Sequence, residues 1–251
     1  MSSTHEFKLP SGVMAEVTEM VGKHQKMLTR QDKRSLAEKL NDVIKDVTVR
    51  IGSVTNKEEI AKIVDSMLSC DKKKILIEAR QFSMDFPKEF DFVYEYINSE
   101  NKEEKYEMKL NLEEAFKMKL LKDQYEEYRD VVKEVAFTLP RSKREVVWTM
   151  MDSKADAKAM KYKKEDLSSH TPIELRNPRE RKETTMVKLN LDELSFKDIE
   201  ALRENIKEVE GQVDTEFRFE HPESSSKSEQ EKYVIADLIG SIAFFFPSGA
   251  I

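Results

Sequence analysis

Residues 7–21 read Phe-Lys-Leu-Pro-Ser-Gly-Val-Met-Ala-Glu-Val-Thr-Glu-Met-Val, and this stretch predicts a β-hairpin. Ser11-Gly12 is a turn signal, because glycine accepts backbone angles that other residues avoid. Beyond the turn, apolar residues occupy every second position, at Val13, Ala15 and Val17. This alternation is typical of a strand with one buried face.

A hairpin of the same kind is predicted at residues 132–151, where Phe137-x-Leu139-Pro140 repeats Phe7-x-Leu9-Pro10. A second pair of similar segments reads Lys-Leu-Asn-Leu, at residues 109–112 and 188–191, each followed by two acidic residues. One interpretation is coincidence between short strand–turn patterns. The other is a reused unit of strand, turn, strand and helix, which would make the chain a pseudo-duplicated scaffold.

The region between the two Leu-Pro hairpins is predicted to be largely helical. Three segments carry apolar residues at helical spacing with charged residues on the opposite face. Thr29 is the expected cap of the first, and Thr55 to Glu58 form a capping-box pattern for the second. The third is expected to begin near Asp71.

Other elements follow from the same patterns. Residues 90–112 predict an aromatic hairpin, and a helix is expected to follow it, with inward-facing Phe116, Leu120, Leu121, Tyr125 and Tyr128. Further predictions are a short helix around 153–161, a loop at 168–181, a strand at 186–191, a helix after Ser195 and a strand at 215–219. A final apolar helix is expected to end at Pro247.

The predicted fold class is therefore α+β, with several β-hairpins interleaved with amphipathic helices in a multi-module chain. We expect five modules: an N-terminal hairpin module (1–30), a helical region (31–89), an aromatic hairpin plus helix (90–131), the second Leu-Pro hairpin with an α/β module (132–221), and a linker with the apolar C-terminal helix (222–251).

Composition excludes several function classes. The chain has 251 residues, 37% of them charged, and a net charge of −6, so the sequence predicts no nucleic-acid partner. Cys70 is the single cysteine, which excludes an intrachain disulfide and fits a reducing compartment. The sequence also predicts no signal peptide and no membrane-spanning segment.

The sequence predicts no enzyme. None of the four histidines is paired at a metal-ligand spacing, and phosphate-cradling and nucleophile-elbow patterns are absent. A hydrolase that uses Asp85, Asp91 or His170 is disfavoured, because nothing in the sequence ties these residues together. We therefore expect no catalytic residue, no cofactor and no metal.

The candidate partner-binding residues are at two places in the chain. Leu139 and Pro140 lie in the second hairpin, and the C-terminal stretch supplies Ile242, Phe244, Phe245 and Phe246. The C-terminal aromatics have two interpretations: they close the hydrophobic core, or they form an exposed tail that docks on a partner.

Several motifs together resemble one protein family. They are Asp71-x-x-x-Ile-Leu-Ile-x-Ala-Arg-x-Phe-Ser83 followed by the aromatic hairpin, then Phe137-x-Leu-Pro140, Leu167-Ser-Ser-His-Thr-Pro172 and Glu210-Gly-Gln-Val-Asp-Thr215. In these motifs the chain resembles the baseplate-hub and tail-assembly proteins of T-even-type contractile-tailed phages. The resemblance extends over most of the chain through short motifs.

The resemblance implies a non-enzymatic role in virion assembly, as a structural subunit or as an assembly chaperone. Its implied partners are phage tail or baseplate hub proteins, and self-association is left open. Its implied location is the host cell cytoplasm during assembly, or the tail baseplate of the virion.

Many family members carry a zinc-ribbon-like hairpin around positions 92–106, where this chain has Tyr94, Tyr96 and Asn98 and no cysteine. No zinc ligand is therefore inferred. The alternative function is a cellular scaffold or adaptor without a viral role.

Overall fold

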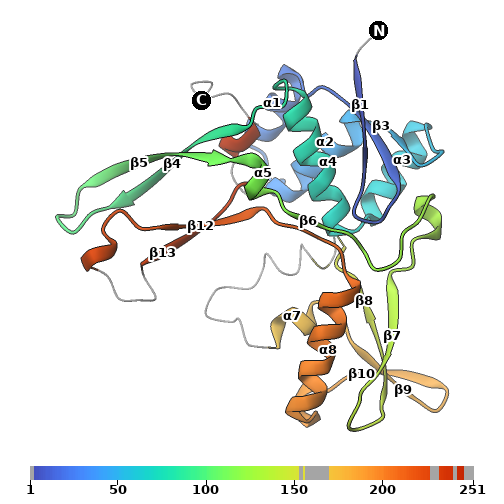
Figure 1. Ribbon diagram of the computed structural model, residues 1–251. Coiled ribbons are helices and arrows are strands. Elements are labelled where there is room, and N and C mark those ends of the chain that lie inside the picture. The colour runs from blue at the N-terminus through green and yellow to red at the C-terminus, as the bar shows by residue number, and fades with distance from the viewer. Residues whose placement is uncertain (1–2, 153–154, 156–169, 227–231, 240–241, 246–251) are drawn as a thin grey trace.

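The computed structural model describes residues 3–152, 155, 170–226, 232–239 and 242–245. Within them the chain is an α+β protein whose antiparallel strands form several small sheets, as predicted. Figure 1 shows two lobes at the right and an arm that projects to the left. Buried hydrophobic side chains from the lobes and the base of the arm form one continuous cluster.

The first lobe is a three-stranded antiparallel sheet packed against helices. Its strands lie in the order β1 (Thr4–Lys8), β2 (Met14–Thr18) and β3 (Thr48–Ile51). The β1–β2 hairpin is confirmed, with Phe7 opposite Ala15. Its helices are α1 (Gly22–Thr29), α2 (Leu36–Val47), α3 (Lys57–Ser66) and α4 (Ser69–Phe82). Strand β3 falls inside the region that was predicted to be helical.

Two of the predicted helix starts are wrong. Ser35 caps α2 in a capping box with Glu38, and Asn56 caps α3 in place of Thr55. Thr29 is the last residue of α1, a helix that the sequence patterns did not predict. Several small polar residues precede each helix, and the sequence does not rank them as caps, because the choice depends on where the chain enters the helix.

The second lobe is a four-stranded antiparallel sheet with one long helix. Its strands lie in the order β10 (Thr185–Lys188), β9 (Arg179–Lys182), β8 (Glu145–Thr149) and β7 (Glu134–Thr138). The helical elements are α7 (Thr171–Glu174), η3 (Leu191–Glu193) and α8 (Phe196–Val209). The β7–β8 hairpin and the helix after Ser195 are confirmed.

Two predictions for the second lobe have other outcomes. The loop predicted at 168–181 is wrong in its described part, because α7 and the start of β9 lie there. Local hydrogen bonds from Thr171 onward and pairing with β8 give this stretch regular structure. The short helix predicted around 153–161 lies, apart from Ala155, outside the described residues.

The arm consists of two hairpins from distant parts of the chain. Strands β4 (Glu89–Ile97) and β5 (Glu103–Asn111) form the predicted aromatic hairpin. Strands β12 (Glu216–Glu220) and β13 (Tyr233–Asp237) form the other. The apolar helix predicted within 222–251 is therefore wrong in its described part. Residues 233–237 alternate between exposed and half-buried as a strand, and η5 (Ile242–Phe245) is a single short turn.

The helix predicted after residue 112 is also wrong. Only α5 (Leu112–Ala115) is helical, β6 (Met118–Lys119) pairs with β11 (Gln212–Val213), and η1 (Tyr128–Asp130) follows. Residues 118–128, here called the covering segment, run over the turn of the β1–β2 hairpin. Hydrogen bonds to that turn take the place of the helical ones.

The two lobes share a longer structural unit than the similar sequence segments indicated. In each, a Leu-Pro hairpin precedes a 14-residue helix, α4 or α8, and an arm hairpin follows the helix. The bond that closes each arm hairpin is repeated: Leu112 N–H donates to the Lys88 carbonyl, and Leu238 N–H donates to the Thr215 carbonyl, both at 2.9 Å. This common construction favours the reused unit over coincidence.

The two Lys-Leu-Asn-Leu segments also have similar structures. Asn111 caps α5 and Asn190 caps η3, each by accepting a hydrogen bond from the N–H two residues later. The next residue, Leu112 or Leu191, is buried. Each segment therefore ends a strand and starts a helical turn in the same way.

Candidate functional site

The two Leu-Pro turns, residues 9–13 and 139–144, are built alike. In the first turn, Leu9 N–H donates to the Val13 carbonyl and Gly12 N–H donates to the Leu9 carbonyl, both at 2.9 Å. In the second turn, Leu139 N–H donates to the Arg144 carbonyl and Lys143 N–H donates to the Leu139 carbonyl, both at 3.0 Å. Both leucine side chains are fully buried. An aspartate at the third position of the 14-residue helix accepts hydrogen bonds from the backbone of each turn.

In the first lobe this aspartate is Asp71. Its Oδ1 accepts a hydrogen bond from Ser11 N–H at 3.0 Å, whereas its Oδ2 and the Ser11 hydroxyl have no partner within the described residues. Burial raises the pKa of Asp71 from 3.8 to about 6, and its interactions with Ser11 and Tyr128 oppose that rise only in part. The first turn is thus held by a carboxyl group whose ionisation is opposed by burial.

In the second lobe the equivalent residue is Asp198. Oδ1 accepts from Arg141 N–H at 2.8 Å, and Oδ2 accepts from Ser142 N–H at 3.2 Å and from the Ser195 hydroxyl at 3.0 Å. Burial opposes ionisation, but these donors together hold the pKa of Asp198 below its usual value. The second turn is held by a carboxylate.

The turns differ most in what covers them. Leu121 N–H and the Gln124 amide donate to the Pro10 carbonyl at 2.9 and 3.1 Å, and Tyr125 N–H donates to the Ser11 carbonyl at 2.9 Å. The first turn is buried under these contacts. In the second turn, residues 140–143 are exposed. Of the two partner-binding residues predicted there, Leu139 is inside the lobe and only Pro140 is at the surface.

Aromatic rings hold the two hairpins of the arm together. Phe92 meets Phe217 edge-on at 4.8 Å between ring centroids, and Tyr94 meets Phe219 edge-on at 5.2 Å. Such pairs add to the stabilisation from burial alone. The arm is therefore a two-layer stack whose rings are only half-buried.

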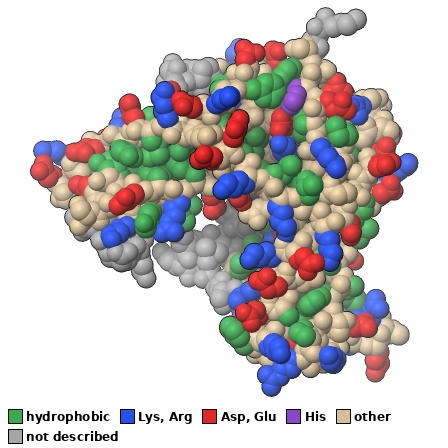
Figure 2. Space-filling view, in the orientation of Figure 1, with side chains coloured by type: hydrophobic (Ala, Val, Ile, Leu, Met, Phe, Trp, Pro, Cys, Tyr) green, Lys and Arg blue, Asp and Glu red, His purple; other side chains and the backbone are tan. Residues whose placement is uncertain are grey.

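The outer surfaces of the arm are unusually apolar for a projecting element. Ile97 is 65% exposed and Ile235 is 66% exposed, with Val93 and Tyr233 also exposed. Figure 2 shows apolar side chains along the arm over β4 and β5, framed by charged groups. Within the described residues each arm sheet has only two strands, so its outward strand edges offer unpaired backbone groups.

The C-terminal aromatics are packed inside this chain where the structure describes them. Phe244 is fully buried against Phe90 and Phe116, and Phe245 is buried beside it. Arg80 Nε donates to the Phe244 carbonyl at 2.9 Å, and its guanidinium is over the Phe244 ring. These two rings thus have the core-closing role.

The side chains of the other two C-terminal candidates, Ile242 and Phe246, lie outside the part of the chain that the structure describes. The Ile242 backbone begins η5, and Phe246 is outside the described residues.

The residues considered for hydrolysis belong to three different elements. Asp85 lies in the turn after α4, Asp91 is on the exposed side of β4, and His170 precedes α7 with Nδ1 3.7 Å from Asp192.

Cys70 lines a cavity of about 390 Å³ between α4 and α8, and burial raises the pKa of its thiol well above the usual value. A protonated, buried thiol is a poor nucleophile.

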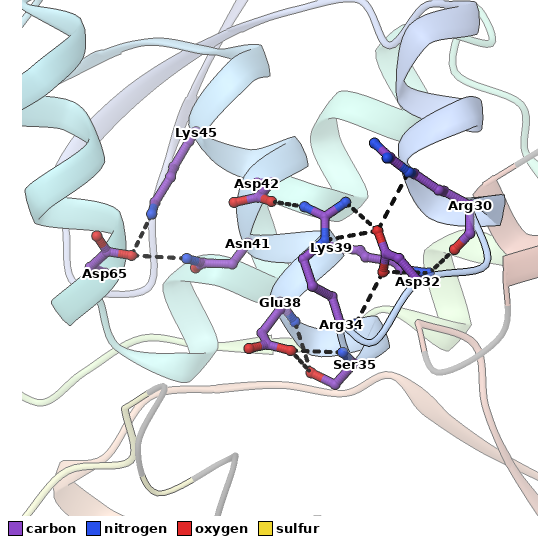
Figure 3. Close-up of polar contacts among 10 residues, drawn as sticks. All are labelled: Arg30, Asp32, Arg34, Ser35, Glu38, Lys39, Asn41, Asp42, Lys45 and Asp65. Atoms are coloured by element: carbon purple, nitrogen blue, oxygen red, sulfur yellow. Dashed lines mark hydrogen bonds and ion pairs between the residues drawn. The ribbon is translucent and has the colours of Figure 1, made fainter.

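His24 and a charged network on α2 have structural roles. His24 Nδ1 accepts from Val21 N–H at 2.8 Å, so the ring caps α1, and Nε2 is 2.6 Å from Asp46. Figure 3 shows the network at the start of α2, where Arg34 bridges Asp32 and Asp42. The Arg34 hydrogen bonds lower the pKa of Asp32 to about 2, so this pair is ionised and has no proton to transfer.

No group of three or more potential metal ligands occurs in the part of the chain that the structure describes. Among the same residues, no helix is long and apolar enough to span a bilayer. Comparisons with protein-family models, with curated proteins and with solved structures find no match. The case for function therefore depends on the sequence and the geometry of this chain itself.

Sequence reasoning missed two features of these sites. It did not connect Asp71 and Asp198 with the turns, although each lies near the start of a helix that follows a Leu-Pro hairpin. It also missed the second arm hairpin, although Phe217, Phe219, Val234 and Ala236 occupy alternate positions. In both cases the signal was present locally, and the missing information was the long-range contact.

Proposed function

We propose that this protein acts without catalysis, by binding other proteins during assembly of the baseplate hub or tail of a contractile-tailed phage. The observation that carries the binding role is the arm, which projects from the body with unpaired strand edges and exposed isoleucines. Strand edges of this kind accept a partner strand through backbone hydrogen bonds.

The viral context comes from the sequence resemblance, and the geometry is compatible with it. A duplicated unit with two hairpins projecting from its body suits a subunit or chaperone that bridges neighbouring proteins. The cellular scaffold or adaptor remains the second candidate, because the same arm would serve it equally well.

The test is capture of partners by the tagged full-length chain in the cells that normally make it. Recovery of tail or baseplate hub proteins supports the proposal, whereas recovery of host proteins alone supports the cellular scaffold. Analysis of purified particles then separates a structural subunit, which stays in the virion, from an assembly chaperone, which does not.

Paired arm variants show which surface is responsible. Ile97→Lys and Ile235→Lys place charges on exposed positions of the arm, so folding is retained and capture is lost. Phe196→Lys is the matched control, because Phe196 is 77% exposed on α8, away from the arm. Loss of capture in the control alone, or unchanged capture in both arm variants, contradicts an arm interface.

A further inference from the structure

The tip of the second Leu-Pro hairpin is an uncovered counterpart of a surface that this chain covers elsewhere. Both tips have the same internal hydrogen bonds and an aspartate from the following helix. The first is buried under the covering segment, and the second projects from the lower end of the second lobe in Figure 1. The first lobe therefore shows how such a tip is recognised.

Recognition of the first tip uses two kinds of contact. Backbone and amide N–H groups of Leu121 and Gln124 donate to the Pro10 carbonyl, while the Leu121 side chain is buried. Three of the charged residues that follow Leu121 are acidic, namely Asp123, Glu126 and Glu127. The occupant is an extended, leucine-bearing, mainly acidic segment.

The second tip has a stronger electrostatic reason to bind such a segment. The first tip is uncharged, whereas the second contains Arg141, Lys143 and Arg144. Arg144 is neutralised by Glu180, with Nε 2.7 Å from Oε1. Arg141 and Lys143 are exposed and form no ion pair within the described residues. Two cations at a protruding tip favour an anionic partner.

One difference limits how the occupant lies. At Gly12 a side chain would meet Tyr125 N at 2.8 Å, so the covering segment approaches the turn only because glycine is there. Lys143 has the equivalent place in the second tip, with a φ of 59°, and its Cβ excludes such an approach. The backbone of a partner therefore contacts the Pro140 carbonyl and stays away from the backbone at Lys143, while its side chains reach the charged ends of Arg141 and Lys143.

From these contacts we infer that the tip at Pro140–Lys143 binds an extended acidic segment of another protein. The segment donates backbone N–H groups to the Pro140 carbonyl and places carboxylates beside Arg141 and Lys143. This inference does not depend on the tail-assembly role, because it names the chemistry of the partner and not its source.

The probe is a labelled, end-blocked peptide with the sequence of residues 120–127, Leu-Leu-Lys-Asp-Gln-Tyr-Glu-Glu, titrated into the full chain and followed by fluorescence anisotropy. Binding is expected at low salt and is expected to weaken as salt rises. Arg141→Glu with Lys143→Glu weakens it by roughly tenfold or more, because two attractive charge pairs become repulsive. Lys33→Glu, at an exposed position of the first lobe, leaves it unchanged.

Three results overturn the inference. They are absence of peptide binding at low salt, equal binding by the tip variant and the Lys33→Glu control, and self-association of the chain that the tip variant abolishes. The third result would make a second copy of this chain the occupant. Unchanged thermal unfolding of the variants shows that a loss of binding is not a loss of folding.

Discussion

The two Leu-Pro turns are the same motif in two environments. The environment shifts the pKa of the aspartate that holds each turn in opposite directions. Asp71 is under a covered turn with one N–H donor and has a raised pKa. Asp198 has donors at both oxygens and a lowered pKa. A repeated backbone motif thus fixes where a carboxyl group lies, whereas its burial and its hydrogen-bond donors decide whether its pKa is raised or lowered.

The largest effect is expected at the leucines that anchor the turns. Leu9→Ala and Leu139→Ala each remove a fully buried side chain, and each should lower the free energy of unfolding by about 2–5 kcal/mol. Chemical denaturation measures both. Leu120→Ala is the control, since Leu120 is 41% exposed and should cost less than about 1 kcal/mol. A small effect at only one of the two leucines would break the equivalence of the turns.

The glycine position should respond in opposite directions in the two turns. Gly12→Ala combines a left-handed φ of 96° with contact against Tyr125, and should cost about 2–4 kcal/mol. Lys143→Gly relieves a non-glycine residue at a φ of 59° in an exposed turn and should be neutral or slightly stabilising. Thermal unfolding of both variants tests this, and tolerance of Gly12→Ala would show that the covering segment is not packed on the turn.

The aspartates should respond to pH with opposite signs. The raised pKa of Asp71 means that its favourable contribution is complete below about pH 4 and is lost as pH rises through 6, so Asp71→Asn gains up to about 3 kcal/mol over wild type at neutral pH. The lowered pKa of Asp198 means that its contribution is present above its usual pKa of 3.8 and is lost as pH falls through the lower folded value.

At pH 7, Asp198→Asn should therefore cost about 1–3 kcal/mol. Urea denaturation of both variants at several pH values between 4 and 7 provides the comparison. Stability changes of the same sign at neutral pH would show that the two environments do not shift the pKa values of the carboxyl groups in opposite directions.

An effect no larger than that of Asp198→Asn is expected where the covering segment is tied to α4. Leu68 N–H donates to the Tyr128 hydroxyl at 2.7 Å in a buried position, so Tyr128→Phe leaves that N–H without a partner and should cost about 1–3 kcal/mol. Amide hydrogen exchange at residues 9–13 should also accelerate. Tyr125→Phe is the matched control in the same segment, and an equal effect there would remove the special role of Tyr128.

The sequence alone determined the local elements. Turn residues fixed the two Leu-Pro hairpins, alternation fixed the aromatic hairpin, and helical periodicity located α2, α3 and α4, because each signal lies within a short stretch. The sequence patterns failed at residues 116–127 and 233–237, where apolar residues fitted a helix and the chain was extended or strand-like instead. There, pairing with distant strands and turns overrode local preference.

Tertiary structure alone decided which turn is covered and which aspartate has a raised pKa. It also placed Phe244 and Phe245 in the core, because Arg80 and the base of the arm, far away in the chain, surround them. Burial and hydrogen-bond partners are properties of long-range contacts, and a local sequence motif carries no record of them. The two Leu-Pro turns show this most directly, since the proline after the buried leucine is covered in one lobe and exposed in the other.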